Sequence, residues 1–155
     1  MRDIDPVRMA AWRRFLDTHA AVVRVLGDEL RATVDLPLSW YDVLVTLEES
    51  PDGRLRMSDL AERVVLSQSG ITRLVDRMSE MGLVRREVCG SDGRSRFAVL
   101  TAAGQQVLHD AAPTHIEGVW EHFASHLTDE EAATLATALE RVGRAAASHR
   151  SAKRA

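Results

Sequence analysis

The sequence predicts a mainly α-helical fold with one small β-hairpin, on the basis of two observations within residues 58–101. First, two short amphipathic helical patterns follow one another, and the second ends at Gly82, a residue type that readily adopts the left-handed conformation found after helices. Second, two short strand patterns, 83–89 and 96–100, flank a turn rich in Gly, Ser and Asp. Two helices followed by a hairpin are typical of a winged helix-turn-helix, in which the hairpin is the wing.

The two helices of this unit are predicted from their N-caps and their apolar spacing. Ser58 is expected to cap the first helix, and Ser67 the second. One face of the first helix is formed by Leu60, Ala61 and Val64. The 3.6-residue period of the second helix is carried by Ile71, Leu74, Val75, Met78 and Met81. Both helices therefore have an apolar face to bury.

The polar face of the second helix carries hydroxyl, amide and guanidinium groups. Such groups contact base edges in the major groove and the phosphates beside it. The predicted DNA-contacting residues of this helix are Ser67, Gln68, Ser69, Thr72, Arg73 and Arg77.

The turn of the hairpin, residues 90–95, carries Asp92 and Arg94. A guanidinium group suits the negative potential of a narrow minor groove, so Arg94 is predicted to enter one and Asp92 to hold the Arg94 side chain extended. Taken alone, such a turn is more typical of a solvent-exposed loop, but the preceding helix pair favours the DNA interpretation. The predicted DNA-contacting residues of the hairpin are Arg86, Asp92, Arg94 and Arg96.

Further helices are predicted before this unit. Asp5 and Pro6 begin a long helix that runs to about Thr33. A second helix is predicted over Ser39–Glu49, with a capping box formed by Ser39 and Asp42.

Beyond the hairpin, Thr101 is expected to cap a helix that runs to about Leu127, and Thr128 to open a final helix with a capping box. A short strand is predicted at residues 55–57. The first and final helices each carry an apolar stripe too large for one chain to bury, which predicts a homodimer. The expected domains are a helical dimerisation region, residues 1–36 and 101–155, and a winged helix-turn-helix DNA-binding domain, residues 37–100.

Several of these motifs together resemble the MarR family of bacterial transcriptional regulators. The resemblance is carried by Ser67-x-Ser69-Gly70-Ile71-Thr72-Arg73-Leu74-Val75-Asp76-Arg77-Met78, Gly82-Leu83-Val84-x-Arg86, Asp92-x-Arg94 and Leu100-Thr101-x-x-Gly104. It implies a homodimer that binds a pseudopalindromic operator in double-stranded DNA. It also implies a regulator that usually represses and often releases DNA on meeting a small aromatic or anionic ligand, or an oxidant.

The charge distribution is compatible with DNA binding. The chain of 155 residues has a formal net charge of −3. Within Arg54–Arg96, however, nine arginines and six acidic residues give +3, and the rest of the chain carries −6. Neutralising phosphates requires local rather than net positive charge, so a basic middle segment is enough.

Composition also limits the function classes. The sequence has no apolar run of membrane-spanning length, no signal-peptide pattern and a single cysteine, as expected of a cytoplasmic protein without membrane contact. It contains no P-loop, nucleophile elbow, dinucleotide fingerprint or paired metal-binding cysteines. Neither enzymatic activity nor a cofactor is therefore predicted.

The resemblance places a ligand pocket between the first helix, the second helix and the base of the long fifth helix. Aromatic walls with a few polar groups suit a flat aromatic acid or phenol. The candidate ligand-binding residues are Trp12, His19, Trp40, Asp42 and His115. The alternative interpretation is that the two tryptophans are ordinary core residues.

Three other interpretations stay open. Cys89 follows Arg86 closely, and nearby positive charge favours an oxidisable thiolate. His122 and His126, with His115 one heptad earlier, form a helical stripe that suits zinc, although no further ligand completes a site and no metal is predicted. The third interpretation comes from a different functional class: the chain would be a helical interaction scaffold that does not bind DNA.

Overall fold

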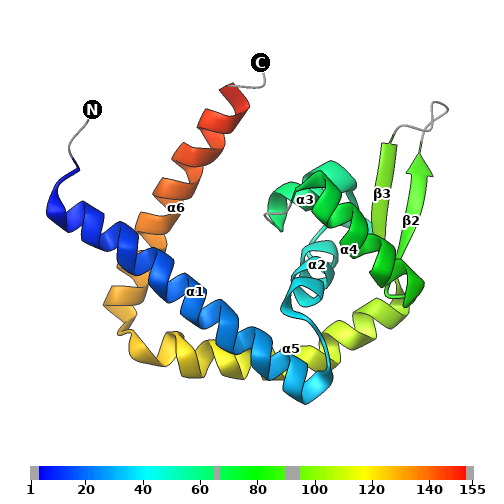
Figure 1. Cartoon of the computed structure of the whole chain (residues 1–155), viewed down its shortest axis with the longest axis horizontal. Coiled ribbons are helices and arrows are strands. Elements are labelled where there is room, and N and C mark those ends of the chain that lie inside the picture. The colour runs from blue at the N-terminus through cyan, green and yellow to red at the C-terminus, as the bar shows by residue number, and fades with distance from the viewer. Residues whose placement is uncertain (1–3, 65–66, 90–94, 153–155) are drawn as a thin grey trace. The chain divides into compact units, whose positions relative to one another are not determined.

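The computed structural model describes residues 4–64, 67–89 and 95–152, and it confirms the predicted fold class (Figure 1). The chain divides into two compact units, Met1–Glu117 and Gly118–Ala155. The α-helices are α1 (Pro6–Val34), α2 (Leu38–Glu48), α3 (Met57–Arg63), α4 (Gln68–Glu80), α5 (Ala102–His122) and α6 (Asp129–Ala152). The strands are β1 (Arg54–Arg56), β2 (Val84–Cys89) and β3 (Ser95–Leu100), and two short 3₁₀ turns are η1 (Pro51–Gly53) and η2 (Ala124–His126).

Four predicted N-caps are confirmed. In each, the cap side chain accepts a hydrogen bond from the backbone N–H three residues later: Arg8 to Asp5, Gly70 to Ser67 and Gly104 to Thr101 at 3.0 Å, and Glu131 to Thr128 at 3.3 Å. Thr128 also donates its backbone N–H to Glu131 Oε2 (2.9 Å). This second bond completes the predicted capping box and lowers the pKa of the Glu131 carboxyl.

Proline, rather than serine, sets the start of α2. The N–H group of Trp40 donates to the Pro37 carbonyl (2.8 Å), so the helix begins at Leu38. Because Pro37 has a fixed φ and an extended backbone, it can serve as the N-cap without any side-chain bond. The predicted capping box of Ser39 and Asp42 is therefore wrong, and Ser39 lies inside the first turn.

The predicted cap of α3 is also wrong. The helix begins at Met57, directly after β1, and its N-cap residue Arg56 makes no side-chain cap. Met57 is only 7% exposed, so burial of its side chain draws it into the first turn. Ser58 is consequently a helical residue whose hydroxyl donates to Asp59 instead (3.0 Å).

The apolar face of α4 is buried as predicted, except at its C-terminal end. Ile71, Leu74, Val75 and Met78 are all at most 6% exposed. Met81 is 67% exposed because it is the C-cap residue, beyond the last turn that packs on the core. Gly82 has a φ of +72°, which confirms it as the helix stop.

The three strands form an antiparallel sheet in the order β1-β3-β2. Their bounds agree with the predicted ones to within one residue. Ala98 pairs with Leu55 on one side and with Arg86 on the other. Leu55, Val84 and Ala98 are buried in the core with residues of α3 and α4. Since side chains alternate along a strand, Phe97 and its cross-strand neighbours occupy the opposite, outer face.

In the second unit, α5 ends at His122 and not at Leu127 as predicted. Phe123 leaves the helical conformation (φ −140°), and η2 follows. Leu127 is extended (φ −117°, ψ 137°), as a residue directly before a capping threonine usually is. The helix is therefore interrupted between His122 and the capping box of Thr128. The sequence analysis did not predict this interruption.

The end of α4, the start of β2, the end of β3 and the start of α5 meet at one junction in the first unit. Thr101, between β3 and α5, donates its backbone N–H to the Leu83 carbonyl (3.2 Å). Its hydroxyl lies 2.7 Å from the Gly82 carbonyl oxygen and 2.9 Å from that of Leu83. Gly104 approaches so closely that a Cβ atom there would lie 2.0 Å from the Leu83 carbonyl oxygen. We call Gly82, Leu83, Thr101 and Gly104 the α4–α5 junction.

We predict that Gly104→Ala destabilises the fold. The added methyl group overlaps backbone, which cannot rotate away, so the cost should reach about 1–3 kcal/mol or more of the free energy of unfolding. Urea denaturation at fixed protomer concentration measures it. The matched control is Gly143→Ala in α6, where a Cβ atom meets nothing within 4 Å; there we expect a gain of about 0.5–1 kcal/mol. Equal stability of the two variants would contradict the proposed close contact.

Candidate nucleic-acid interface

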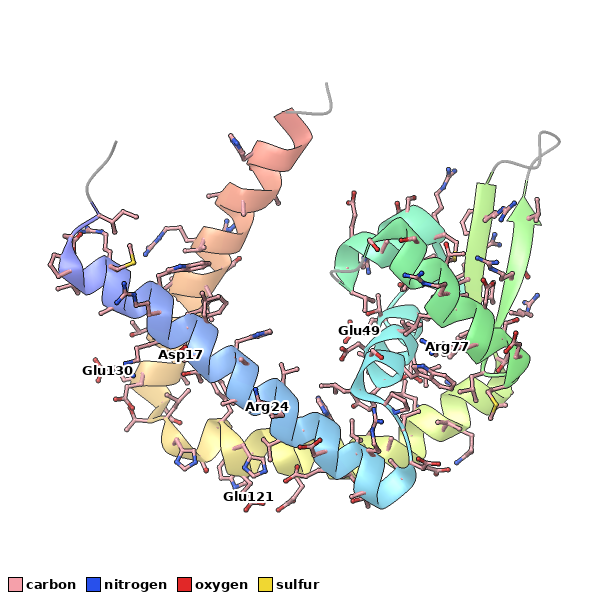
Figure 2. The ribbon with its side chains drawn as sticks, viewed as in Figure 1. Asp17, Arg24, Glu49, Arg77, Glu121 and Glu130 are labelled. Carbon is pink, nitrogen blue, oxygen red and sulfur yellow. The ribbon has the colours of Figure 1, made fainter. Side chains whose placement is uncertain are left out.

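The polar face of α4 is exposed, as DNA contacts require. Arg73 and Arg77 are exposed on this face, and Thr72 is partly exposed (Figure 2 labels Arg77). At the N-terminal end, the Ser67 hydroxyl caps the helix and lies 3.2 Å from the Ser69 hydroxyl. Gln68 starts α4, but its side chain lies outside the described part of the structure. The helix thus presents hydroxyl and guanidinium groups on the side opposite the core.

The hairpin formed by β2 and β3 extends beyond the core. Val84 and Ala98 are buried, whereas the pair nearer the turn, Val88 and Arg96, is exposed. Arg96 is therefore available for contacts, as predicted. The predicted contacts at the turn, Asp92 and Arg94, lie outside the described residues.

Arg86, which is a predicted DNA-contacting residue, also has a partner within the protein. Its guanidinium forms an ion pair with Asp76 of α4 (2.6 Å), and both side chains are partly buried. The Arg86 Nε atom is fully buried, and no hydrogen-bond partner for it lies among the residues described. Because Arg86 lies on the inner face of β2, this pair connects the predicted DNA-contacting helix to the wing.

We predict that Asp76 and Arg86 are coupled energetically. In a double-mutant cycle with Asp76→Ala and Arg86→Ala, we expect an interaction of about 1 kcal/mol in the free energy of unfolding, since the pair is only partly screened by solvent. Chemical denaturation of the four proteins measures it. The control pair is Glu140–Arg144 on α6 (3.1 Å), whose side chains are 63% and 74% exposed. There we expect at most about 0.5 kcal/mol. Additive effects at Asp76 and Arg86 would mean that the pair does not brace the wing.

The outer face of the sheet holds a basic cluster that the sequence analysis missed. The guanidinium carbons of Arg54 and Arg56 lie 4.4 and 5.5 Å from the centre of the Phe97 ring. Glu87 pairs with Arg54 (3.7 Å) and with Arg85. Alternation along a strand was the available signal, since Arg54 and Arg56 are two residues apart, although the predicted strand, residues 55–57, included only Arg56. Their neighbours on β2 and β3, however, depend on a register that the sequence does not specify.

Among the candidate ligand-binding residues, His115 of α5 packs against Tyr41 of α2. The ring centres are 4.4 Å apart. Burial lowers the pKa of His115 and raises that of Tyr41, so both rings favour the neutral form. The Nδ1 atom of His115 is buried and has no hydrogen-bond partner within the described ranges. Nearby in sequence, Trp40 is partly buried, and desolvation raises the pKa of Asp42.

The other two candidates lie on α1 in a separate aromatic row. Trp12, which is 55% exposed, stacks on Phe15 (6.1 Å between ring centres), and Phe15 lies 6.2 Å from His19. No ring contact joins this row to Trp40 or His115 in the portion of the chain that is described. The predicted ligand set therefore divides into two groups.

We predict that His115 makes stability depend on pH. Its pKa in the folded chain lies below the ordinary value of 6.5. As the pH falls below about 6.5, the unfolded chain binds a proton that the folded chain excludes, so stability is lost on the acid side. His115→Gln should make the free energy of unfolding less dependent on pH between 7.5 and 5. The control is His126→Gln, which replaces an exposed imidazole in η2. If both variants behave alike, burial of His115 does not control its protonation.

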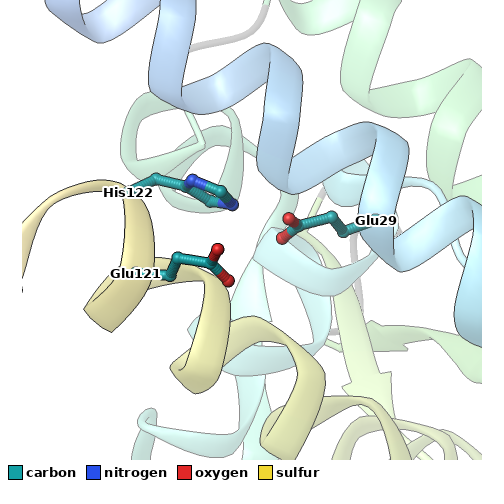
Figure 3. Close-up of side chains that lie close together, drawn as sticks. All are labelled: Glu29, Glu121 and His122. Atoms are coloured by element: carbon teal, nitrogen blue, oxygen red, sulfur yellow. The ribbon is translucent and has the colours of Figure 1, made fainter.

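The remaining candidates for sensing are not assembled as predicted. His122 is the last residue of α5, next to Glu121 (Figure 3), and His126 lies in η2. The break at Phe123 thus removes the i, i+4 relationship on one helix that favoured zinc. The Cys89 side chain lies outside the described part of the structure. None of the described helices combines the length and apolar character needed to cross a membrane.

Comparisons with known proteins give a consistent result. The model of the MarR family matches residues 34–95. The transcriptional regulator HosA of Escherichia coli is 35% identical over 97 residues, which cover 63% of this chain and 70% of HosA. The crystal structure of AbsC, a MarR family transcriptional regulator from Streptomyces coelicolor, shares 34% identity with a TM-score of 0.84, and the match covers 96% of this chain and 99% of AbsC.

A further similar structure contains DNA. Sco3205, a MarR family transcriptional regulator from Streptomyces coelicolor, was solved in complex with DNA and is 32% identical, with a TM-score of 0.84. The match covers 94% of this chain and 91% of Sco3205. These relatives are transcriptional regulators and not enzymes. Given its identity with AbsC over almost the whole length of both proteins, the chain belongs to the MarR family of transcriptional regulators.

Proposed function

We propose that this regulator binds a pseudopalindromic operator in double-stranded DNA as a homodimer. The observation that carries the proposal is the exposed polar face of α4 beside a hairpin that extends beyond the core. A helix of this kind fits the major groove, and a neighbouring hairpin reaches the adjacent minor groove. The similar protein Sco3205 was solved in complex with DNA, which supports DNA binding by this chain. A DNA-bound regulator of a bacterial chromosome would act in the cytoplasm.

The predicted contact residues of α4 and β2 differ in their proposed roles. Arg73 and Thr72 lie in the middle of the exposed face and would contact base edges, while Arg77 and the hydroxyl groups at the N-terminus of α4 would contact phosphates. Arg86 would act mainly by holding the wing against α4. The proposed DNA contacts are Ser67, Gln68, Ser69, Thr72, Arg73, Arg77, Arg86, Asp92, Arg94 and Arg96.

The proposed dimer is supported by exposed apolar side chains on the helices near both termini. On α1, Trp12, Leu16 and Val23 are 41–55% exposed, and on α6 Leu139 and Val142 are 41% and 64% exposed. Apolar groups grouped on helices in this way usually belong to interfaces. We therefore assign dimerisation to residues 1–36 and 101–155, and DNA binding to residues 37–100.

Repression relieved by a small aromatic or anionic ligand is the proposed mode of regulation. The support is the Tyr41–His115 pair, a partly buried aromatic contact in which the His115 Nδ1 atom has no hydrogen-bond partner among the described residues and would accept or donate one to a ligand. Such a ligand can release DNA only by binding the non-binding arrangement more tightly than the DNA-binding one. Trp12, His19, Trp40, Asp42 and His115 stay the candidate ligand-binding residues.

Substitution of Arg73 tests the proposed function. We expect Arg73→Ala to weaken binding to a duplex that the protein selects from a random DNA library by about 1–3 kcal/mol, and to relax specificity at one position of each half-site. Fluorescence anisotropy at several salt concentrations measures the affinity. Arg24→Ala, an exposed arginine on α1, is the matched control and should bind like the wild type (Figure 2).

Two outcomes would contradict this proposal. If the wild type selects no sequence and its binding to DNA does not weaken with salt, the chain acts as a helical interaction scaffold. If Arg73→Ala binds the selected duplex as tightly as the wild type, α4 does not contact bases as proposed.

A further inference from the structure

The outer face of the sheet carries a basic cluster that the proposed DNA contacts leave unused. It consists of Arg54 and Arg56 of β1, Arg85 and Glu87 of β2, and Phe97 of β3; we call it the outer basic face. The strand register explains the grouping. Phe97 pairs with Arg56 on one side and with Glu87 on the other, while Val99 pairs with Arg54 and Arg85. Paired residues share a face, so this face carries three arginines and one carboxylate, and the carboxylate pairs with Arg54 and Arg85.

The arginines of this face are held in place before any partner binds. Arg54 and Arg56 stack over the Phe97 ring at 4.4 and 5.5 Å, distances at which a cation is attracted to the ring face. Glu87, 27% exposed, pairs with both Arg54 and Arg85. Arg85 is 60% exposed, so its charge reaches solvent. Because these side chains are already ordered, binding an anion through them costs less conformational entropy.

The position of this face relates it to the proposed DNA site. The inner face of the sheet is buried against α3 and α4, so the outer face points away from α4 (Figure 1). The two faces share the hairpin of β2 and β3. In the proposed complex, a duplex that contacts α4 and passes the hairpin would reach the outer basic face next.

We propose that the outer basic face contacts phosphates of the DNA that flanks the operator, beyond the wing. This inference rests on the proposed DNA-binding function and extends it. Charge complementarity identifies the partner, because planar guanidinium groups bind phosphate oxygens through paired hydrogen bonds. The arginines cover the Phe97 ring, which leaves it poorly placed to stack on a base. These contacts would thus add affinity that depends on the length of the DNA and not on its sequence.

Two duplexes test the proposal with the full-length protein. The short one contains only the sequence that the protein selects from a random library, and the long one extends it by about ten base pairs on each side. We expect the wild type to bind the long duplex more tightly and with a steeper salt dependence. In Arg56→Ala/Arg85→Ala, the slope of log K against log salt on the long duplex should become shallower by about 1–2, since each phosphate contact contributes about 0.9. Binding of the short duplex should not change.

A charge-preserving variant supplies the matched control. Arg56→Lys/Arg85→Lys keeps both positive charges and should retain most of the salt slope, and thermal melting of all variants checks folding. If the flanks add nothing for the wild type, or if the alanine variant weakens both duplexes equally, the outer basic face does not bind flanking DNA. Unchanged binding of both duplexes by the alanine variant points to another partner, such as an acidic protein, and also overturns the proposal. Absence of binding to the short duplex would instead overturn the proposed function itself.

Discussion

The contact between Gly104 and the Leu83 carbonyl is the constraint on which the winged helix-turn-helix depends. The end of α4, the start of β2, the end of β3 and the start of α5 all meet there. The Thr101 hydroxyl and N–H satisfy the carbonyl groups that the left-handed turn at Gly82 leaves exposed. A glycine is required because only a residue without a Cβ atom lets α5 approach the backbone so closely. Backbone contacts therefore help to fix the spacing of α4, the wing and α5, together with the Thr101 hydroxyl.

Ion pairs provide a second connection between α4 and the wing. The Asp76–Arg86 ion pair braces β2 against α4 from the inner side of the sheet, and Glu87 organises arginines on its outer side. Acidic residues thus have a constructive role inside a basic region, since they hold guanidinium groups in defined places. This explains how a chain with a net charge of −3 keeps a surface suited to phosphates. Local geometry, rather than the sum of charges, decides which surface attracts DNA.

Local signals in the sequence were enough to predict α4 and its surroundings. Ser67, Gly82 and Thr128 act through neighbours three or fewer residues away, so their roles follow from sequence alone. The predictions at Ser39 and Ser58 failed because distant burial and a preceding proline decide where those helices begin. At the site, exposure of Arg73 and Arg77 followed from the 3.6-residue period, whereas the partners of Arg86 and Phe97 required the strand register.

The contacts of α5 indicate how a signal near α2 would reach α4, the proposed DNA-contacting helix. α5 holds α2 at several points: His115 packs on Tyr41, and Glu48 accepts hydrogen bonds from Gln105 (3.2 Å) and pairs with His109 (2.8 Å). α2 in turn belongs to the same buried core as α3 and α4. Through the α4–α5 junction, α5 also contacts the end of α4, so α2 and α4 are both connected to α5. A ligand that changed the Tyr41–His115 contact would therefore act on a packed assembly of α2, α4 and α5. Packed assemblies switch between discrete arrangements and do not deform continuously, which favours a two-state response over a gradual one.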